Sequence, residues 1–401
     1  MQKFTRYERY LMKEEYQVSN LVSPIEGSDL LNKKAAEMGD ELIKMHIMTD
    51  QTPPASVRVA AAMQALKGGY IKNIFPLRDR ISKFYKKYRN VQYNPENEIL
   101  ITVGCQLGLD CTFKLLVEPE DEIIFFEPDY ALYKPMIHFY GGQPVSIPLI
   151  LKNNKWCFDK ESFSSKISKK TKMVILSNPN NPTGYIYRKE DLDFIVDLVQ
   201  ENNCWLVSDE IWSLLLLDEK IPYISIATYE KIKDRLITLF SPSKTFGMSG
   251  YRTGAILGPH NFIKAIGQVV RSSVQAAPTI GQIAFEEAMD FEITKNWVND
   301  RVKKIKQRTI YITQKLKIFK KIECAIPESG VFLFPSIKKY KISSLNFALK
   351  LMEEKKVFIL PGYFFGSNSD GFVRISLSVP EKDFESGFEK FFEFLEELEK
   401  K

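Results

Sequence analysis

A lysine follows an apolar run in the middle of the chain, at a place where an amine can act as a covalent catalyst. Leu236–Phe240 has the composition of a buried strand, and Lys244 comes just after it, among small hydroxylated residues and glycines. A desolvated, neutral amine can form a Schiff base with an aldehyde. A surface loop that carries an ordinary solvated lysine is the alternative interpretation.

Groups suited to bind a phosphate stand close to this lysine. Ser241 and Ser243 offer hydroxyl donors, and Arg252 offers a forked guanidinium. A molecule that joins an aldehyde to a phosphate is pyridoxal phosphate (PLP), and the stretch therefore favours a PLP site. Short motifs recur by chance, so the rest of the chain has to decide.

These residues need a scaffold, and between about residues 98 and 258 short apolar runs alternate with helical segments. This alternation predicts a mostly parallel α/β sheet, in which ligands bind beyond the carboxyl ends of the strands. The expected strands are Ile99–Val103, Glu122–Phe126, Met173–Ser177, Cys204–Ser208, Leu236–Phe240 and Thr253–Leu257. The residues that follow them should meet at one edge of the sheet.

Two of these strand ends suit the two parts of the cofactor, its ring and its phosphate. Tyr130 comes just after Glu122–Phe126 and can stack its ring on a flat group, although a packing tyrosine is the alternative. Gly104–Gly108 opens a helix whose free amides can bind phosphate, and a plain strand-to-helix turn is the alternative.

Two further strand ends carry polar groups suited to a pyridine ring. Asn181, in the turn-forming loop Asn178–Gly184, can reach a phenolic oxygen. Asp209, after Cys204–Ser208, should be buried and needs a cationic partner, for which a protonated pyridine nitrogen would serve. That pairing makes the ring an electron sink. An aspartate that caps the next helix is the alternative.

One arginine stands inside an expected strand of the last third of the chain. Arg374 lies between the apolar neighbours of Gly371–Leu377, where a charge is costly unless it is paired. A substrate carboxylate bound by both arms of the guanidinium would explain it. An internal ion pair is the alternative.

Taken together, these residues resemble the class I/II aminotransferase family, fold type I of the PLP-dependent enzymes, from about Asn20 to the carboxyl end. The motifs that carry the resemblance are the Gly104 turn, Pro128-Asp-Tyr130, Asn181-Pro-Thr-Gly184, Asp209-Glu-Ile211, Ser241-x-x-Lys244, Arg252, Pro361-Gly362, Phe365-Gly366 and Arg374. The stretch Ser213–Pro222 also has some likeness to the cystathionine β-lyase type subgroup.

The resemblance implies a role for each candidate residue. Lys244 holds PLP as an internal aldimine and then moves the α-proton of the substrate, and Arg374 grips the substrate carboxylate. The implied cofactor-binding residues are the amides of Cys105 and Gln106, with Tyr130, Asn181, Asp209, Trp212, Ser241, Ser243 and Arg252. Tyr70 is implied to reach the phosphate of the neighbouring subunit, in a homodimer with shared active sites.

Three departures from the family pattern bear on the substrate and on the reaction type rather than on the identity of the cofactor. Ile47–Gln51 stands where the family often has Gly-x-Pro-Asp-Phe, so the glycine is replaced. The usual motif Asp-Glu-x-Tyr ends here in Trp212. An indole N–H can donate a hydrogen bond but, unlike a phenol, cannot accept one. The segment from Tyr70 to Leu77 is about two residues shorter than usual.

The length of 401 residues predicts two domains. We expect an α/β fold: a large cofactor-binding domain over residues 46–290, with a mostly parallel central sheet between helices, and a smaller α+β domain over residues 291–401. The segment 1–45 is expected to join the small domain, with helical spacing over Leu30–Lys44.

Composition argues against several other classes of function. The net charge of +6 over 56 basic and 50 acidic residues is small, so a nucleic-acid partner is not expected. No apolar run approaches the length of a membrane span, and the start lacks a secretory signal. Five scattered cysteines favour a reducing cytoplasm, and three histidines argue against a histidine-rich metal site.

The leading hypothesis is an aminotransferase that moves the amino group of an L-amino acid to a 2-oxo acid. A carbon–sulfur β-lyase is the second hypothesis, and oxidation or decarboxylation on the same cofactor stays open. A non-catalytic amino-acid sensor is disfavoured, since no helix-turn-helix precedes the family-like part. Ile47, Trp212 and Phe332 suggest an apolar or aromatic amino donor.

Overall fold

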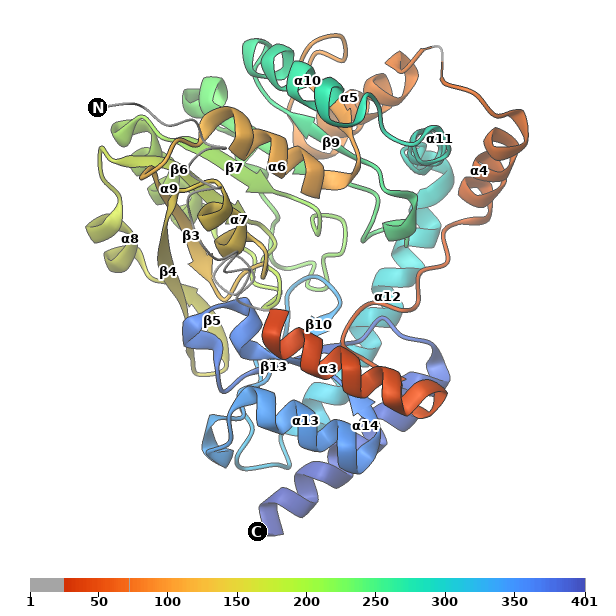
Figure 1. Ribbon diagram of the computed structural model, residues 1–401, viewed down its shortest axis with the longest axis vertical. Helices are drawn as coiled ribbons and strands as arrows, with labels where there is room; N and C mark the ends of the chain where they lie inside the picture. Colours follow the sequence, from red (N-terminus) through yellow and green to blue (C-terminus); the bar gives the residue numbers. More distant parts are fainter. Residues whose placement is uncertain (1–24, 72, 401) are drawn as a thin grey trace, which may run out of the picture.

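The computed structural model describes residues 25–71 and 73–400, and an eight-stranded sheet is its largest element (Figure 1). The strands, in spatial order, are β2 (Ile99–Thr102), β9 (Gly254–Leu257), β8 (Leu236–Phe240), β7 (Trp205–Asp209), β6 (Thr171–Ser177), β3 (Glu122–Glu127), β4 (Gln143–Lys152) and β5 (Lys155–Phe158). The run from β8 to β4 is parallel, and β9, β2 and β5 are attached in antiparallel fashion. The prediction of a mostly parallel α/β sheet is confirmed.

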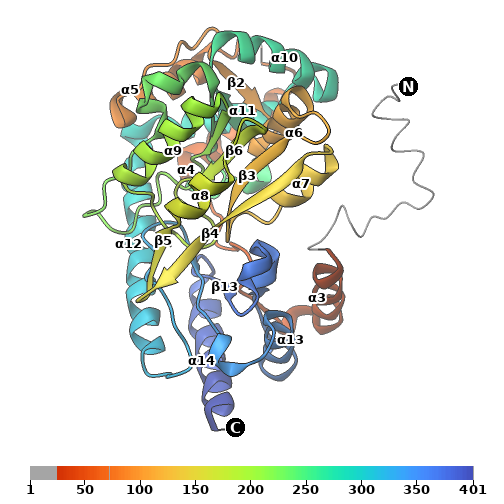
Figure 2. The same cartoon turned by 90° about the vertical axis from the view of Figure 1, so that its left-hand side faces the viewer.

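The two faces of this sheet are buried beneath different helices, which explains why its strands are apolar throughout. Along β3, Ile123 and Phe125 belong to one cluster of buried side chains, and Ile124 and Phe126 belong to the other. The first face carries α6 (Gly104–Leu116), α7 (Tyr133–Phe139) and α10 (His260–Val274), and the second carries α5 (Phe75–Arg89), α8 (Lys160–Lys166) and α9 (Lys189–Asn202). Figure 2 shows α6 and α7 on one side of the strands and α8 and α9 on the other.

Strands β4 and β5 were not expected from the sequence. Proline is rare inside strands because it cannot donate to the ladder, yet Pro144 and Pro148 of β4 both pair with β3. β5 is a short hairpin partner at the edge of the sheet. These two strands therefore depend on their neighbours rather than on a local pattern.

The last third of the chain forms smaller sheets and long helices. Helix α12 (Phe291–Leu316) leads from the large sheet to this part (Figure 1), where β13 (Val373–Ser376) pairs with β10 (Phe332–Leu333) and β12 (Leu360–Pro361). Helix α13 (Ser344–Lys355) packs against β12 and against helix α14 (Glu381–Lys400). The division of the chain at residues 45 and 290 stays a prediction.

The N-terminal segment differs from the expected single helix over Leu30–Lys44. Helix α3 (Ile25–Met38) ends before Gly39, whose φ of +58° suits glycine best. Ile43 and Lys44 then form β1, which pairs in parallel with β11 (Val357–Phe358). The other early helices are α4 (Ala55–Lys67) and α5, and α11 (Thr279–Ala288) packs against α4.

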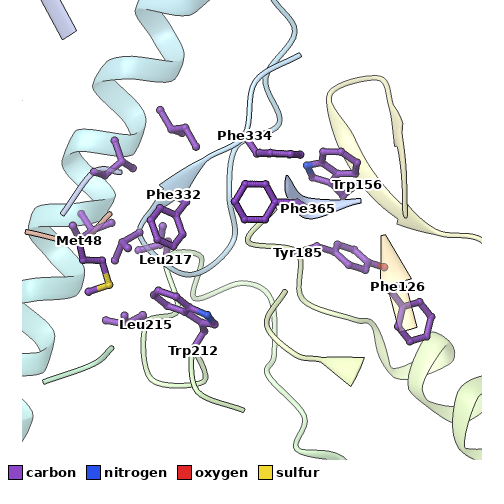
Figure 3. Close-up of a cluster of buried hydrophobic side chains, with 14 of the residues drawn as sticks. Met48, Phe126, Trp156, Tyr185, Trp212, Leu215, Leu217, Phe332, Phe334 and Phe365 are labelled. Carbon is purple, nitrogen blue, oxygen red and sulfur yellow. The ribbon is translucent and has the colours of Figure 1, made fainter. Parts of the chain in front are cut away.

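Aromatic and aliphatic side chains fill the space where the sheet meets the C-terminal part. Figure 3 shows Trp212 beside Phe332, with Phe334, Phe365 and Trp156 farther along the same cluster. Over residues 25–71 and 73–400, no helix is long and apolar enough to cross a membrane. The same residues include no cluster of three or more potential metal ligands.

Candidate active site

A cavity of about 380 Å³ lies at the carboxyl ends of the parallel strands. It brings together all but one of the residues singled out in the sequence: Cys105, Gln106, Tyr130, Asn181, Asp209, Trp212, Ser241, Ser243, Lys244, Arg252 and Arg374. The strand register explains this gathering, because Asp209 at the end of β7 pairs with Ser177 of β6 and with Leu239 of β8. Segments far apart in sequence thus end at one place.

Lys244 presents its amine to this cavity in an environment that disfavours the charged form. Burial lowers its pKa to about 8, and the nearby positive charges of Arg374 and Arg252 act in the same direction. The Nζ atom lies 5.9 Å from the centre of the Trp212 ring. A neutral amine is the nucleophilic form, so the environment of Lys244 is suited to an amine that combines with an aldehyde.

Asp209 is a buried carboxylate that makes two hydrogen bonds. The hydroxyl of Tyr133 donates to Oδ2 over 2.8 Å, and the amide of Ile211 donates to Oδ1 over 3.1 Å. Burial raises the pKa of Asp209 to about 6. No cation within the described part of the chain forms an ion pair with it. The carboxylate is thus suited to an external cation such as a protonated pyridine nitrogen.

The start of α6 and the loop after β8 form a concave site suited to a phosphate. Gly104 has a φ of +68°, and a Cβ there would lie only 3.0 Å from Nη2 of Arg252. The hydroxyl of Ser241 lies 2.8 Å from that of Ser243. Free amides at the start of a helix, two hydroxyl groups and a guanidinium match the needs of a phosphate dianion.

Arg374 is a buried residue of the cavity wall, and two aromatic rings contact its guanidinium. Its Cζ atom lies 4.0 Å from the ring centre of Phe332 and 4.7 Å from that of Phe365. Nη1 donates to Oδ1 of Asn181 over 3.2 Å, and Nη2 donates to the carbonyl of His46 over 3.0 Å. Burial lowers the pKa of Arg374 to about 9.

The alternative of an internal ion pair for Arg374 is wrong for the described residues, since none of their carboxylates lies within ion-pair distance. Its buried Nε makes no hydrogen bond with them either. A buried guanidinium with spare donors fits a substrate carboxylate.

A family model described as aminotransferase class I and II matches residues 48–391. The chain belongs to this family. The aspartate aminotransferase of Pyrococcus horikoshii is 30% identical over 395 residues, which cover 97% of this chain and 98% of the relative. Among solved structures, an aspartate aminotransferase from Thermotoga maritima has a TM-score of 0.86 at 26% identity, over 95% of this chain and 100% of the other.

A second solved structure, an aromatic aminotransferase from Pyrococcus horikoshii, has a TM-score of 0.83 at 26% identity, over 92% of this chain and 99% of the other. The protein is therefore a PLP-dependent aminotransferase of fold type I, which moves the amino group of an L-amino acid to a 2-oxo acid. The buried Asp209, which makes no ion pair with the described residues, the donors around Gly104 and the lowered pKa of Lys244 fit this cofactor.

Tyr130 and Gln106 of the aminotransferase hold each other at the wall of the cavity. The hydroxyl of Tyr130 donates to Oε1 of Gln106 over 3.2 Å, and the amide of Gln106 donates to the sulfur of Met136 over 3.0 Å. The Tyr130 ring meets that of Tyr133 edge to face, 5.4 Å apart. This bracing fixes the orientation of an aromatic ring that can lie against a cofactor.

Tyr70 is the one candidate that does not line the cavity. Its side chain is 79% exposed and lies in a shallow groove beside Val274–Thr279. The aminotransferase chain therefore does not bring Tyr70 to its own phosphate cradle. Its expected role toward a neighbouring subunit stays a prediction.

The aminotransferase site also contains residues that sequence reasoning missed. Tyr133 bonds Asp209, and its place in Asp129-Tyr-Ala-Leu-Tyr133 was a signal that could have drawn attention to it. The carbonyl of His46 and the ring of Phe365 hold Arg374. Phe365 was part of a recognised motif, whereas no local signal marked His46.

Proposed function

We propose that this aminotransferase takes an amino donor with an uncharged, apolar or aromatic side chain, and that Lys244 is its catalytic residue. The observation that carries the substrate class is the set of charges around the cavity. Within the described residues, the only cations in the cavity wall are Lys244, Arg252 and Arg374. Each of them suits a group that the cofactor carries or that every amino donor carries. A second carboxylate on the donor would face no further cation from this chain.

The walls beside Lys244 support an apolar donor. Ile47 replaces the usual glycine and lines the cavity, and Trp212 meets Phe332 edge to face at 5.5 Å. Such surfaces bind apolar groups through burial and ring contacts. Gln51 also lines the cavity, and its side-chain amide donates to the carbonyl of Met48.

PLP, when bound, supplies an aldehyde that combines with amines and a ring that draws electrons from the neighbouring carbon. The proposed roles of the chain follow from the geometry. Lys244 accepts and returns the proton of the donor's α-carbon, Arg374 orients its carboxylate, and Asp209 keeps the pyridine nitrogen protonated. Asn181 and Trp212 border the ring, Tyr130 stacks on it, and the phosphate is held by Cys105, Gln106, Ser241, Ser243 and Arg252.

A homodimer with shared sites is part of the proposal. Val59, Met63 and Leu66 lie along one face of α4 and are 62%, 63% and 85% exposed. An exposed apolar stripe of this kind is typical of an interface, and Tyr70 follows it. We further propose a cytoplasmic location, because all five cysteines are free thiols.

The test is the absorbance spectrum of the PLP-loaded protein against single amino acids without a 2-oxo acid. Leucine or phenylalanine should bleach the yellow band at lower concentration than aspartate, with stoichiometric pyridoxamine phosphate. Lys244→Ala should abolish this conversion. A preference for aspartate would contradict the substrate class, and continuous release of pyruvate and ammonia from cystathionine would identify a β-lyase.

Sedimentation tests the dimer separately. The protein should sediment as a dimer, and Leu66→Glu should weaken it, since a charge on an apolar interface is costly. Lys67→Glu, on the same helix, is the matched control. A monomeric protein with full activity would contradict the shared sites.

A further inference from the structure

A buried carboxyl group outside the cavity contacts the segment that holds Arg374. Glu127 is the last residue of β3 and is only 1% exposed. Its Oε2 accepts a hydrogen bond from the hydroxyl of Ser367 over 3.2 Å. Burial raises the pKa of Glu127, while the charge of Lys134 and the bond from Ser367 oppose that rise.

The turn opposite Glu127 is shaped to receive this carboxyl group. Gly366 has a φ of +135°, and a Cβ there would lie 2.7 Å from Cδ of Glu127. Any larger residue would collide with the carboxyl group and would also be strained. Two residues beyond the end of β3, the amide of Asp129 donates to the carbonyl of Phe365 over 3.0 Å. The end of β3 thus fixes Phe365, Gly366 and Ser367 in succession.

The same turn positions one of the two rings around Arg374. The ring centre of Phe365 lies 4.7 Å from Cζ of Arg374, on the guanidinium that the Phe332 ring also contacts. Figure 3 shows both rings within one cluster. The backbone leads back to the arginine as well, because Leu360, just before the turn, pairs with Arg374 in the β12–β13 ladder.

We propose that Glu127 is a positioning residue for substrate binding: its carboxyl group holds the Phe365–Ser367 turn so that Phe365 keeps the Arg374 guanidinium aimed at the donor carboxylate. Glu127 touches neither substrate nor cofactor. It links the large sheet to the carboxylate-binding arginine of the C-terminal part. This inference rests on the role proposed for Arg374.

Variants of Glu127 separate its hydrogen bond from its charge. Glu127→Gln keeps the size and an acceptor for Ser367 and should bind substrate like the wild type. Glu127→Ala removes the contact with Gly366 and should weaken the binding of a donor carboxylate by roughly tenfold, at nearly unchanged rate under saturation. Ser367→Ala, at an exposed position, should give a smaller loss in the same direction.

A matched control lies at the other end of the same strand. Ser168 donates to Glu122, the first residue of β3, over 3.3 Å. Ser168→Ala removes a Ser–Glu hydrogen bond of the same length class, remote from the cavity, and should leave binding unchanged. If Ser168→Ala and Ser367→Ala weakened binding equally, a general loosening of β3 would replace the proposed link.

The deciding measurement is a double-mutant cycle on inhibition by 3-phenylpropanoate, which has the carboxylate of phenylalanine but no amine. Glu127→Ala should raise the inhibition constant in the wild-type background and leave it unchanged in Arg374→Ala, because its effect passes through Arg374. Inhibition by phenethylamine, which lacks the carboxylate, should not change in either background.

Each outcome of the cycle bears on a specific claim. If Glu127→Ala weakens binding of 3-phenylpropanoate equally in both backgrounds, the role proposed for Glu127 is wrong. It is also wrong if neither Glu127→Ala nor Ser367→Ala weakens this binding. If Glu127→Ala does not fold, Ser367→Ala takes its place in the cycle. If Arg374→Ala alone binds 3-phenylpropanoate like the wild type, the role proposed for Arg374 fails instead, and the inference falls with it.

Discussion

The two buried charges in the wall of the cavity, Asp209 and Arg374, are held in different ways. Asp209 ends a central strand, and its bonds come from Tyr133 at the start of α7 and from Ile211 just beyond β7. Arg374 belongs to β13 in the C-terminal part and is held by Asn181 of the loop after β6 and by the carbonyl of His46, two residues after β1. The carboxylate depends on one sheet, whereas the guanidinium depends on how three parts of the chain meet.

This difference matches the tasks proposed for the two groups. A cofactor stays bound through many turnovers, so a partner on a rigid sheet suits it. A substrate enters and leaves, and a group held by several separate segments can respond to their relative position. The aromatic rings around Arg374 also offset part of the hydration that the buried guanidinium loses, through cation–π attraction.

The largest effect is expected at Asp209. Asp209→Asn keeps the size and an acceptor for Tyr133 but cannot pair with a cation, and we expect the rate at saturating donor to fall roughly 10³-fold, as for a broken buried ion pair. Tyr133→Phe, which removes only a hydrogen bond, is the control and should lose far less. Single-turnover bleaching of the PLP band measures both. A nearly wild-type rate in Asp209→Asn would contradict the proposed pairing of Asp209 with the pyridine nitrogen.

Arg374→Ala should instead act on binding. We expect KM for the donor to rise roughly 10²-fold, since a buried, hydrogen-bonded partner of the carboxylate is lost, while PLP remains bound with its usual absorbance. Arg374→Lys should recover only part of this, because an ammonium cannot form the forked contact. Steady-state kinetics with the absorbance spectrum distinguishes the cases. Loss of PLP from Arg374→Ala would mean that the two sides are not separate.

The surroundings of Asp209 and of Arg374 also differ in how well the sequence predicts them. Lys244, Asp209 and Asn181 follow apolar strands, and the rule that parallel strands end at one edge places them together before any coordinates exist. Tyr133 was missed because the stretch Asp129-Tyr-Ala-Leu-Tyr133 contains two tyrosines, and the local sequence does not show which of them reaches Asp209. The cofactor side is therefore largely predictable from local sequence.

The surroundings of Arg374 could be predicted only in part. The arginine itself is conspicuous, because a charge between apolar strand residues demands a partner. Arg374 contacts His46, which lies more than three hundred residues away in the sequence, and Phe365, which lies about nine residues away. No periodicity of the sequence encodes such packing. The strand β4 was not predicted for a related reason, since Pro144 argues locally against the pairing that β3 imposes.

The burial of Asp209 also makes the free energy of unfolding of the cofactor-free protein depend on pH. The pKa of Asp209 is raised from 3.8 to about 6 on folding, so the stability it contributes is present below pH 3.8 and is lost as the pH rises through 6. Wild type should therefore lose stability relative to Asp209→Asn between pH 4 and 7, by up to roughly 3 kcal/mol. Urea unfolding at both pH values measures the difference. A constant difference would show that Asp209 pays no cost for burial without PLP.

The smallest effect concerns Lys244, which lies between the two charges and feels both with opposite sign. Arg374 lowers its pKa, whereas Asp209 raises it. In cofactor-free protein, PLP uptake should accelerate as the pH rises through about 8, because the neutral amine is the reactive form. Arg374→Leu should move this midpoint upward, and Asp209→Asn should move it slightly downward.

Stopped-flow absorbance of PLP uptake across pH 6 to 10 measures the shift. Burial is the largest cause of the low pKa of Lys244, so both midpoints should stay well below that of an ordinary lysine. Gln51→Ala alters the cavity wall without changing its charge and serves as the control. Shifts of the same sign in the two charge variants would mean that altered burial, rather than the two opposed charges, governs the amine.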